Sequence, residues 1–204
     1  MTPPRPLLLL LDFDGVLADY ARARRVSALA ALAGVAPPRV QTALFDSGLE
    51  EAYDAGRLDT PTYLDRLGQA LGTKIDSDAW VAARLAGTRG RPAVADLLGR
   101  LPGLPLAVLT NNGPLAEAVV LAAQPALLPR LRGRVLSSGR LGMRKPDPQA
   151  YLRALARLDA EPARTLFVDD LFGNVQGARR AGLQAETVRD ARSLGRVLKR
   201  FGLR

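Results

Sequence analysis

Five leucines in a row, at positions 7–11, lead directly into the segment Asp12-Phe13-Asp14-Gly15. An apolar run this short, without alternating polar positions, is typical of a strand buried on both faces of a parallel sheet. Strand side chains alternate between the two faces, so Asp12 and Asp14 start on the same side while Phe13 points into the packing. Gly15 then allows a sharp turn. The two carboxylates repel each other unless a cation or a shared proton intervenes, which predicts a metal site, an acid/base role or both.

Further short β-like runs follow along the chain, with helical patterns between the later ones. They are Leu106–Thr110, Arg134–Ser137, Thr165–Val168 and Ala185–Val188. This alternation predicts an α/β fold, a doubly wound parallel sheet with helices on both faces. Such sheets bind ligands beyond the carboxyl ends of their strands, and polar clusters follow several of these ends. The clusters are Asp12/Asp14, Thr110-Asn111-Asn112, Lys145 and Asp169-Asp170.

More than ninety residues separate Asp14 from the second predicted strand, too many for an ordinary crossover. Helical patterns fill this interval at Arg22–Gly34, Pro38–Phe45, Thr60–Leu71 and Ser77–Ala86. We interpret residues 18–88 as a small α-helical cap inserted after the first strand. Residues 1–17 and 89–204 would form the core domain, to which a helix at Arg91–Arg100 returns the chain.

The composition narrows the chemistry that this chain can perform. Its 204 residues suffice for one α/β domain with an insertion, and they include neither histidine nor cysteine. This excludes Ser-His-Asp hydrolysis, thiolate nucleophiles, disulfides and metal sites built on histidine or cysteine. Catalysis must therefore use carboxylates, hydroxyls, amides, lysine or arginine.

Charge and hydropathy indicate a soluble protein without a dedicated nucleic-acid surface. The formal net charge is +9, but the arginines are scattered and form no dense basic tract interleaved with aromatics. No apolar stretch approaches the roughly 20 residues of a membrane span. The N-terminus also lacks a basic region followed by a long apolar segment. We therefore expect a cytoplasmic protein that binds neither membrane nor nucleic acid.

Lysine is rare in this chain, which makes each lysine informative. Only three of the 29 lysine and arginine residues are lysine, namely Lys74, Lys145 and Lys199. Lys145 directly follows Arg144, so the two cations stand side by side in the sequence. A compact, hydrated ammonium fits where a broad planar guanidinium does not. We interpret Lys145 as a site residue, with an ordinary surface lysine as the alternative.

Four ordered motifs carry a resemblance that spans essentially the whole chain. They are Asp12-Phe13-Asp14-Gly15-Val16-Leu17, Leu109-Thr110-Asn111-Asn112, Arg144-Lys145-Pro146-Asp147-Pro148 and Phe167-Val168-Asp169-Asp170. Together they resemble the haloacid dehalogenase-like (HAD) superfamily of phosphohydrolases, with the helical insertion placed as in its subfamily with a small helical (C1-type) cap. The resemblance implies a Rossmann-like core and Mg²⁺ as the cofactor.

The resemblance also implies separate roles for the acidic residues. Asp12 would attack phosphorus as the nucleophile, and Asp14 would protonate the leaving oxygen and later take a proton from water. Mg²⁺ would be held by Asp12, the backbone carbonyl of Asp14 and Asp170, with Asp169 ligating through water. Asn174 would steady the lysine or the metal shell, or lie on a helix surface. An Asx turn at the first pair and a helix N-cap at the second are the alternatives.

Phosphate would be bound by Thr110, Asn111, Asn112 and Lys145. The first three stand where a strand gives way to a helix, a place rich in N–H groups, and helix capping alone is the alternative. Four aspartates and one magnesium ion leave a negative charge that Lys145 and protonation of Asp14 would cancel. A dianionic phosphate could then enter without strong repulsion, so Lys145 would serve both catalysis and phosphate binding.

Side chains of the insertion would decide which substrate is accepted. Tyr20, Phe45 and Arg57 are the candidates, with core packing or a solvated helix face as the alternative for each. The stretch from Glu51 to Asp59 resembles small-capped members of the superfamily that include sugar-phosphate phosphatases. The expected partner is a small phosphorylated metabolite, and the expected assembly is a monomer or a homodimer.

The expected function is therefore Mg²⁺-dependent hydrolysis of a small phosphomonoester, with three alternatives. A sugar phosphomutase shares the first chemical step, but the resemblance implies cap residues that include a histidine, which this chain lacks. A dehalogenase would use Asp12 against carbon and would not need an acid at Asp14. A noncatalytic HAD-like protein that binds polyanions would lose affinity steeply as salt rises.

Overall fold

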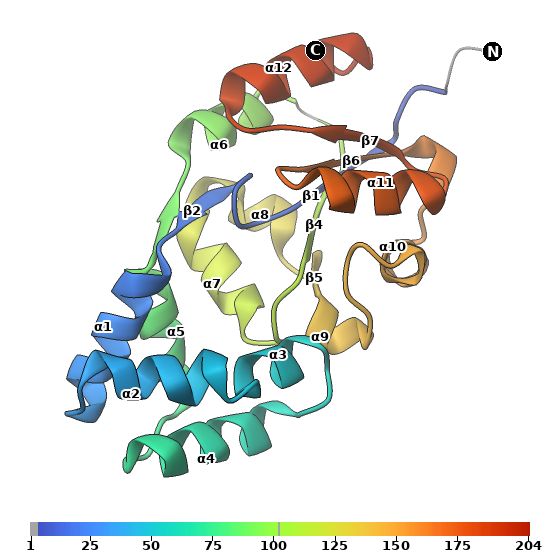
Figure 1. Cartoon of the computed structure of the whole chain (residues 1–204). Coiled ribbons are helices and arrows are strands. Elements are labelled where there is room, and N and C mark those ends of the chain that lie inside the picture. Colours follow the sequence, from blue (N-terminus) through green and yellow to red (C-terminus); the bar gives the residue numbers. More distant parts are fainter. Residues whose placement is uncertain (1–3, 102) are drawn as a thin grey trace.

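A five-stranded parallel sheet, in the order β5-β4-β1-β6-β7, lies at the centre of the protein (Figure 1). The computed structural model describes residues 4–101 and 103–204. The strands are β1 (Leu8–Leu11), β4 (Leu106–Thr110), β5 (Val135–Ser137), β6 (Thr165–Asp169) and β7 (Gln184–Thr187). All five strands expected from the sequence are present, and no predicted end differs by more than one residue. The doubly wound α/β fold is therefore confirmed.

The leucine run divides its side chains between two apolar layers, one on each face of the sheet. Leu9 and Leu11 belong to one cluster, whereas Leu8 and Leu10 belong to the other. The first cluster includes residues of α6 (Pro92–Gly99), α7 (Ala116–Ala123) and α12 (Ala191–Arg200). The second includes residues of α10 (Pro148–Leu158) and α11 (Phe172–Arg180). Burial on both faces explains why the strand carries no polar residue before its end.

The helices between residues 20 and 88 gather together at the lower left of Figure 1. They are α1 (Arg22–Ala33), α2 (Pro37–Gln41), α3 (Leu49–Asp54), α4 (Thr60–Leu71) and α5 (Ser77–Ala86), with a π-helical turn at Thr42–Asp46. Asp59 and Asp76 start α4 and α5 by accepting hydrogen bonds from backbone N–H groups of the first turn. The bounds of α4 and α5 agree with the sequence, whereas α3 was not expected.

Two short antiparallel strands carry the chain away from the sheet and back again. They are β2 (Ala18–Tyr20) and β3 (Thr88–Gly90). The remaining short elements are α8 (Leu128–Leu131), α9 (Ser138–Leu141) and single 3₁₀ turns at Pro125–Leu127 and Pro162–Arg164. Within the described part of the chain, no helix combines the length and apolar character needed to cross a membrane.

Helix α3 packs directly on the loop that follows β4. A Cβ atom placed on Gly113 would lie 2.1 Å from the ring of Tyr53, so no larger residue fits there without movement. The backbone N–H of Leu115 donates to the Tyr53 hydroxyl at 3.2 Å. This close approach brings the inserted helices to the edge of the sheet where the polar strand ends lie.

Candidate active site

Three neighbouring strands end in polar residues that the sequence had singled out. Asp12 follows β1, Thr110 ends β4 and Asp169 ends β6. Because these strands are adjacent and parallel, their carboxyl ends meet at one edge of the sheet. The backbone N–H of Asp12 also donates to the carbonyl of Val168 at 2.9 Å, which continues the register of β1 with β6.

Lys145 lies between two of these carboxylates. Its Nζ is 2.8 Å from Asp12 Oδ1 and 2.7 Å from Asp169 Oδ2, and its side chain is 1% exposed. Burial opposes the ammonium charge, but the two carboxylates outweigh it and raise the pKa of Lys145. The side chain of Asn111 accepts from the Lys145 N–H at 2.9 Å and donates to its carbonyl at 2.8 Å. The Asn111 carboxamide thus holds the backbone of Lys145.

Asp169 is fully buried and surrounded by donors. Its Oδ2 accepts from Lys145 Nζ and from Asn174 Nδ2 at 2.9 Å. Its Oδ1 accepts from the Leu171 N–H at 2.8 Å and from Asn174 Nδ2 at 3.1 Å. A carboxylate offers about four lone-pair directions, so these contacts use most of its accepting capacity. Asn174 therefore steadies Asp169, which in turn orients the lysine.

Asp170 lies against the turn that follows β1. A Cβ atom on Gly15 would come within 2.3 Å of Asp170 Oδ2, and the φ angle of Gly15 is +87°. Glycine satisfies both the close approach and the left-handed backbone. Burial, reinforced by the charge of Asp169, raises the pKa of Asp170. Carboxylate oxygens of Asp12, Asp169 and Asp170 lie within 4.8 Å of one another.

These three carboxylates outnumber the single ammonium among them. Burial raises the pKa of Asp12 to about 7; Lys145 opposes this shift, and Asp169 adds to it. Such crowding favours either proton uptake or a bound cation. All of the donors are oxygen atoms, which hard ions such as Mg²⁺ prefer. The residues present therefore fit a magnesium ion held by Asp12 and Asp170.

Asp14 is held by two donors on one of its oxygens. Its Oδ2 accepts from Arg84 Nη2 at 2.6 Å and from Asn112 Nδ2 at 3.3 Å. The Asn112 amide also donates to Thr110 Oγ1 at 2.7 Å. Arg84, on α5, is a site residue that the sequence did not predict, because it looks like the many other arginines of this chain. The other oxygen, Oδ1, is buried without a hydrogen-bond partner among residues 4–101 and 103–204.

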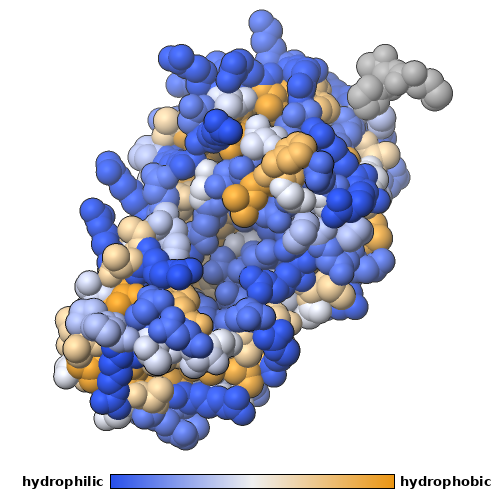
Figure 2. Space-filling view, in the orientation of Figure 1, coloured by the Kyte–Doolittle hydropathy of each residue, from blue (hydrophilic) through white to orange (hydrophobic). Residues whose placement is uncertain are grey.

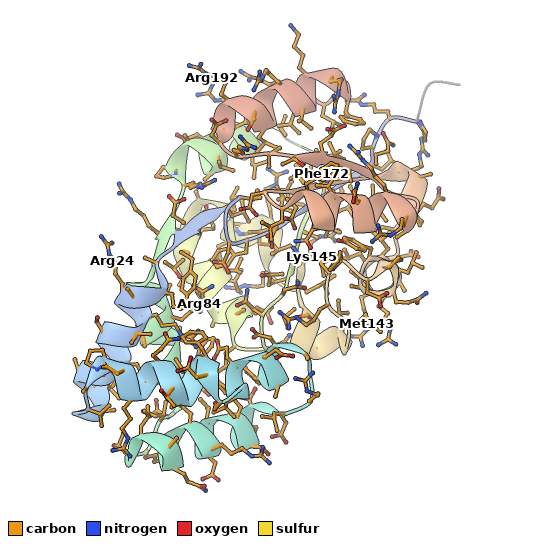
Figure 3. All side chains as sticks on the ribbon, in the orientation of Figure 1. Arg24, Arg84, Met143, Lys145, Phe172 and Arg192 are labelled. Atoms are coloured by element: carbon orange, nitrogen blue, oxygen red, sulfur yellow. The ribbon has the colours of Figure 1, made fainter. Side chains whose placement is uncertain are left out.

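A cavity of about 490 Å³ opens at this edge of the sheet, where Figure 2 shows a hollow between the two parts of the molecule. Its lining includes Asp12, Asp14, Thr110, Asn111, Asn112 and Asp170, joined by Gly15, Asp19, Tyr20, Leu171 and Asn174. Lys145 and Asp169 are buried. Arg84 and Lys145 approach this region from opposite sides, one from the inserted helices and one from the core (Figure 3). The cavity is therefore rich in carboxylates and amides.

One of the three predicted specificity residues lines this cavity. Tyr20 does so, with its ring 3.6 Å from the Arg84 guanidinium carbon. Phe45 lies instead beneath the guanidinium of Arg22, at 4.2 Å from ring centroid to carbon. Arg57 is largely exposed and pairs with Glu51 at 3.1 Å. Neither Phe45 nor Arg57 is among the residues that line the cavity.

Comparison with known proteins identifies curated relatives of this chain. Phosphatase MT3486 of Mycobacterium tuberculosis is 40% identical over 123 residues, which are 55% of this chain and 55% of the relative. The chain thus matches about half the length of that relative. Protein CbbY of Cupriavidus necator is 30% identical over 198 residues, covering 86% of this chain and 75% of that protein.

Solved structures share the fold. A HAD-like family hydrolase from Porphyromonas gingivalis aligns with a TM-score of 0.75 and 21% identity, over 96% of this chain and 99% of the other. A HAD family enzyme from Bacteroides thetaiotaomicron, solved with magnesium and inorganic phosphate, aligns with a TM-score of 0.69 and 19% identity, over 89% and 93%. The model of the haloacid dehalogenase-like hydrolase family matches residues 7–182. The chain belongs to the haloacid dehalogenase-like hydrolase family.

Proposed function

We propose that this protein is a Mg²⁺-dependent phosphatase that hydrolyses a small phosphomonoester through an aspartyl-phosphate on Asp12. The placement of Asp12 carries the proposal. Its carboxylate lines the cavity, lies 2.8 Å from Lys145 Nζ and stands within 4.8 Å of Asp170. The phosphatase name of the Mycobacterium relative and the magnesium and phosphate in the Bacteroides neighbour support the same chemistry.

The reaction would use Asp12 and Asp14 in two steps. Asp12 attacks phosphorus, the bond to the leaving oxygen breaks, and Asp14 gives its proton to that oxygen. In the second step Asp14 takes a proton from a water molecule, whose oxygen attacks phosphorus and releases phosphate from Asp12. Two carboxylates with different surroundings can divide these tasks, because one contacts the lysine and the other an arginine and an amide.

Lys145, Thr110 and the strand-end amides would balance the charge of the phosphoryl group. Lys145 is fixed between Asp12 and Asp169 and needs no rearrangement to face a phosphate on Asp12. The Thr110 hydroxyl and the backbone N–H groups of Asn111 and Asn112 would hold phosphate oxygens. Asp12, the Asp14 carbonyl and Asp170 would hold Mg²⁺, which would neutralise oxygen charge on the transferring group. Asp169 would contribute through water, because its own oxygens already accept several hydrogen bonds.

Residues 18–88 would form a cap over the cavity, and residues 1–17 and 89–204 the core. The cap would admit a small metabolite, with a sugar phosphate as the first candidate, and Tyr20 would contact it because it lines the cavity. Phe45 and Arg57 would contact substrate only if the inserted helices move relative to the sheet. Lids of this kind often gate access to enzyme sites.

Phosphate release from a panel of substrates tests this function. Purified protein with Mg²⁺ should release inorganic phosphate from one or more of the sugar phosphates, phosphoglycolate, nucleotides and flavin mononucleotide. Asp12→Asn should lower the rate to below about one thousandth of wild type, because the nucleophile is lost. Rapid quenching followed by mass spectrometry should find a phosphoryl group on Asp12 of the wild-type protein.

A matched control separates the site from general effects of charge. Asp96→Asn changes an exposed aspartate on α6 and should leave the rate unchanged. The proposal fails if wild-type protein releases no phosphate from any member of the panel. It also fails if Asp12→Asn retains the wild-type rate while circular dichroism shows both proteins folded.

A further inference from the structure

The guanidinium of Arg84 reaches from the inserted helices to the carboxylate of Asp14. Its Nη2 is 2.6 Å from Asp14 Oδ2, and its side chain is only 3% exposed. Its Nη1 donates to Thr88 Oγ1 at 2.8 Å, and its planar face lies 3.6 Å from the ring centroid of Tyr20. Arginine is common on the surface of this protein, but this one is buried and contacts three different segments.

Those three segments are the ones that join the inserted helices to the sheet. Tyr20 belongs to β2, by which the chain leaves the sheet, and Thr88 belongs to β3, by which it returns. Asp14 lies in the turn between β1 and β2. One side chain on α5 therefore connects both crossing strands to the carboxylate expected to act as acid and base.

The two carboxylate oxygens of Asp14 differ in their hydrogen-bond partners. Oδ2 accepts from both Arg84 and Asn112, whereas Oδ1 is buried and has no hydrogen-bond partner within the described residues. A buried polar atom without a partner is costly, so the contacts of Oδ2 must hold the carboxylate in this orientation. Two donors on one oxygen fix the rotation of the carboxylate beside the cavity that Asp14 lines. A planar, forked guanidinium suits this task better than an ammonium.

We propose that Arg84 is a positioning residue for Asp14. Its contact with Oδ2 holds the carboxylate in the orientation from which Asp14 would pass its proton to the leaving oxygen of the substrate. This inference rests on the proposed phosphatase function, and it adds a part played by the inserted helices in the proton-transfer step. It predicts that loss of Arg84 matters most when the leaving group needs a proton.

Leaving-group dependence in single-turnover kinetics tests the proposal. An alkyl phosphate needs a proton on its departing oxygen, whereas p-nitrophenyl phosphate releases an anion that is stable by itself. Arg84→Met should lower the first-turnover rate of the alkyl phosphate by about 100-fold, the lower end of what a general acid contributes, and that of p-nitrophenyl phosphate by less than about threefold. Arg89→Met changes an exposed arginine on β3 and should alter neither rate.

Two further variants keep the test decisive. Arg84→Lys keeps a cation but lacks the fork, so it should show a smaller loss, on the order of 10-fold, with the same dependence on the leaving group. This variant decides the question if Arg84→Met does not fold. In an Asp14→Asn background, Arg84→Met should have no further effect on the ratio of the two rates, because the group it positions is already lost.

The outcomes distinguish this inference from the proposed function. Equal losses with both substrates, in Arg84→Met or in Arg84→Lys, would overturn the positioning role and leave a purely structural arginine. The positioning role would also be overturned if Arg84→Met changed the ratio of the two rates as much in the Asp14→Asn background as in the wild-type protein. If wild-type protein releases no phosphate from any substrate tested, or if Asp12→Asn releases it at the wild-type rate, the proposed function itself is wrong.

Discussion

Two buried clusters in this protein combine acids with bases, and they do so in different proportions. At the edge of the sheet, Lys145 serves both Asp12 and Asp169 and faces an open cavity. Inside the inserted helices, Arg25 pairs with Glu50 alone, at 2.5 Å and 3.1 Å. One cluster carries more negative than positive charge, and the other is balanced one to one.

The surroundings of the balanced pair are closed and aromatic. Tyr63 donates its hydroxyl hydrogen to Glu50 and accepts from the indole N–H of Trp80 at 2.8 Å. The rings of Tyr53 and Tyr63 stack at a centroid distance of 4.0 Å. Arg25 and Glu50 use their charges on each other and do not line the cavity at the sheet edge, although Arg25 Nε has no hydrogen-bond partner within the described residues. Both clusters bury charged groups, but only the one at the sheet edge combines an excess of carboxylates with a cavity. That combination, rather than buried charge by itself, distinguishes the candidate active site.

Removing Lys145, the cation shared by Asp12 and Asp169, should have the largest effect on stability and activity. Lys145→Met leaves two buried carboxylates facing each other, so the free energy of unfolding should fall by about 3–5 kcal/mol. Phosphate release should fall below detection. Urea unfolding measures the first effect, and Lys199→Met, on the exposed side of α12, should stay within about 0.5 kcal/mol of wild type. Equal stability of Lys145→Met and wild type would contradict the charge argument.

Removing the cation of the balanced pair should cost about 3 kcal/mol of unfolding free energy. Arg25→Leu strands Glu50 in the interior, where the side chain is only 8% exposed. The double change Arg25→Leu/Glu50→Leu should recover most of the loss, because a balanced buried pair can be replaced by apolar side chains. Urea unfolding of the two single variants and the double variant gives the coupling. A double variant no more stable than Arg25→Leu would show that the pair is more than a balanced structural contact.

Magnesium should stabilise the unbalanced cluster by a smaller amount. A cation that binds only the folded protein adds about 1.4 kcal/mol at ten times its dissociation constant, and the melting temperature should rise accordingly. Asp170→Asn should abolish the rise, since it removes one of the three clustered carboxylates. Asp96→Asn should retain it. Sodium chloride at matched ionic strength should give no comparable rise; a similar rise with sodium would remove the case for a specific site.

The smallest effect concerns Asp54, which lies near the balanced pair. Burial and then Glu50 raise the pKa of Asp54 to about 8, against the lowering effect of Arg25. The folded protein therefore holds this proton more tightly than the unfolded chain, and stability declines as the pH rises through the window from about 4 to about 8. Between about pH 7 and pH 9, wild type should lose on the order of 1 kcal/mol more than Asp54→Asn. Identical pH profiles in urea unfolding would refute the assignment.

The sequence predicts the sheet well because its strands are continuous apolar runs. It also predicts which polar residues meet, since Asp12, Thr110 and Asp169 follow strands that a doubly wound order places side by side. Lys145 was chosen from the sequence because lysine is rare in this chain and an ammonium is more compact than a guanidinium. In the structure its ammonium group lies between two carboxylates, at 2.8 Å and 2.7 Å.

The sequence could not predict the tertiary contacts of residue types that occur throughout the chain. Arg84 lies 70 residues from Asp14 in the chain, and nothing local separates it from other arginines. The Asn111 carboxamide hydrogen-bonds the backbone of Lys145, 34 residues further along the chain, and no local pattern indicated this contact. Phe45 and Arg57 were placed near substrate although helical periodicity does not tell which face of an inserted helix meets the sheet.

Trp80 gives the protein a built-in optical probe. It is the single tryptophan of the chain, and it stands on α5 one helical turn before Arg84. Its indole donates to Tyr63, and the Arg25 guanidinium carbon lies 4.8 Å from its ring. Indole emission responds to nearby charge and hydrogen bonding, so a rearrangement of α5 against Tyr63 or Arg25 should change the fluorescence. Rearrangements of the inserted helices relative to one another can therefore be followed in the unlabelled protein.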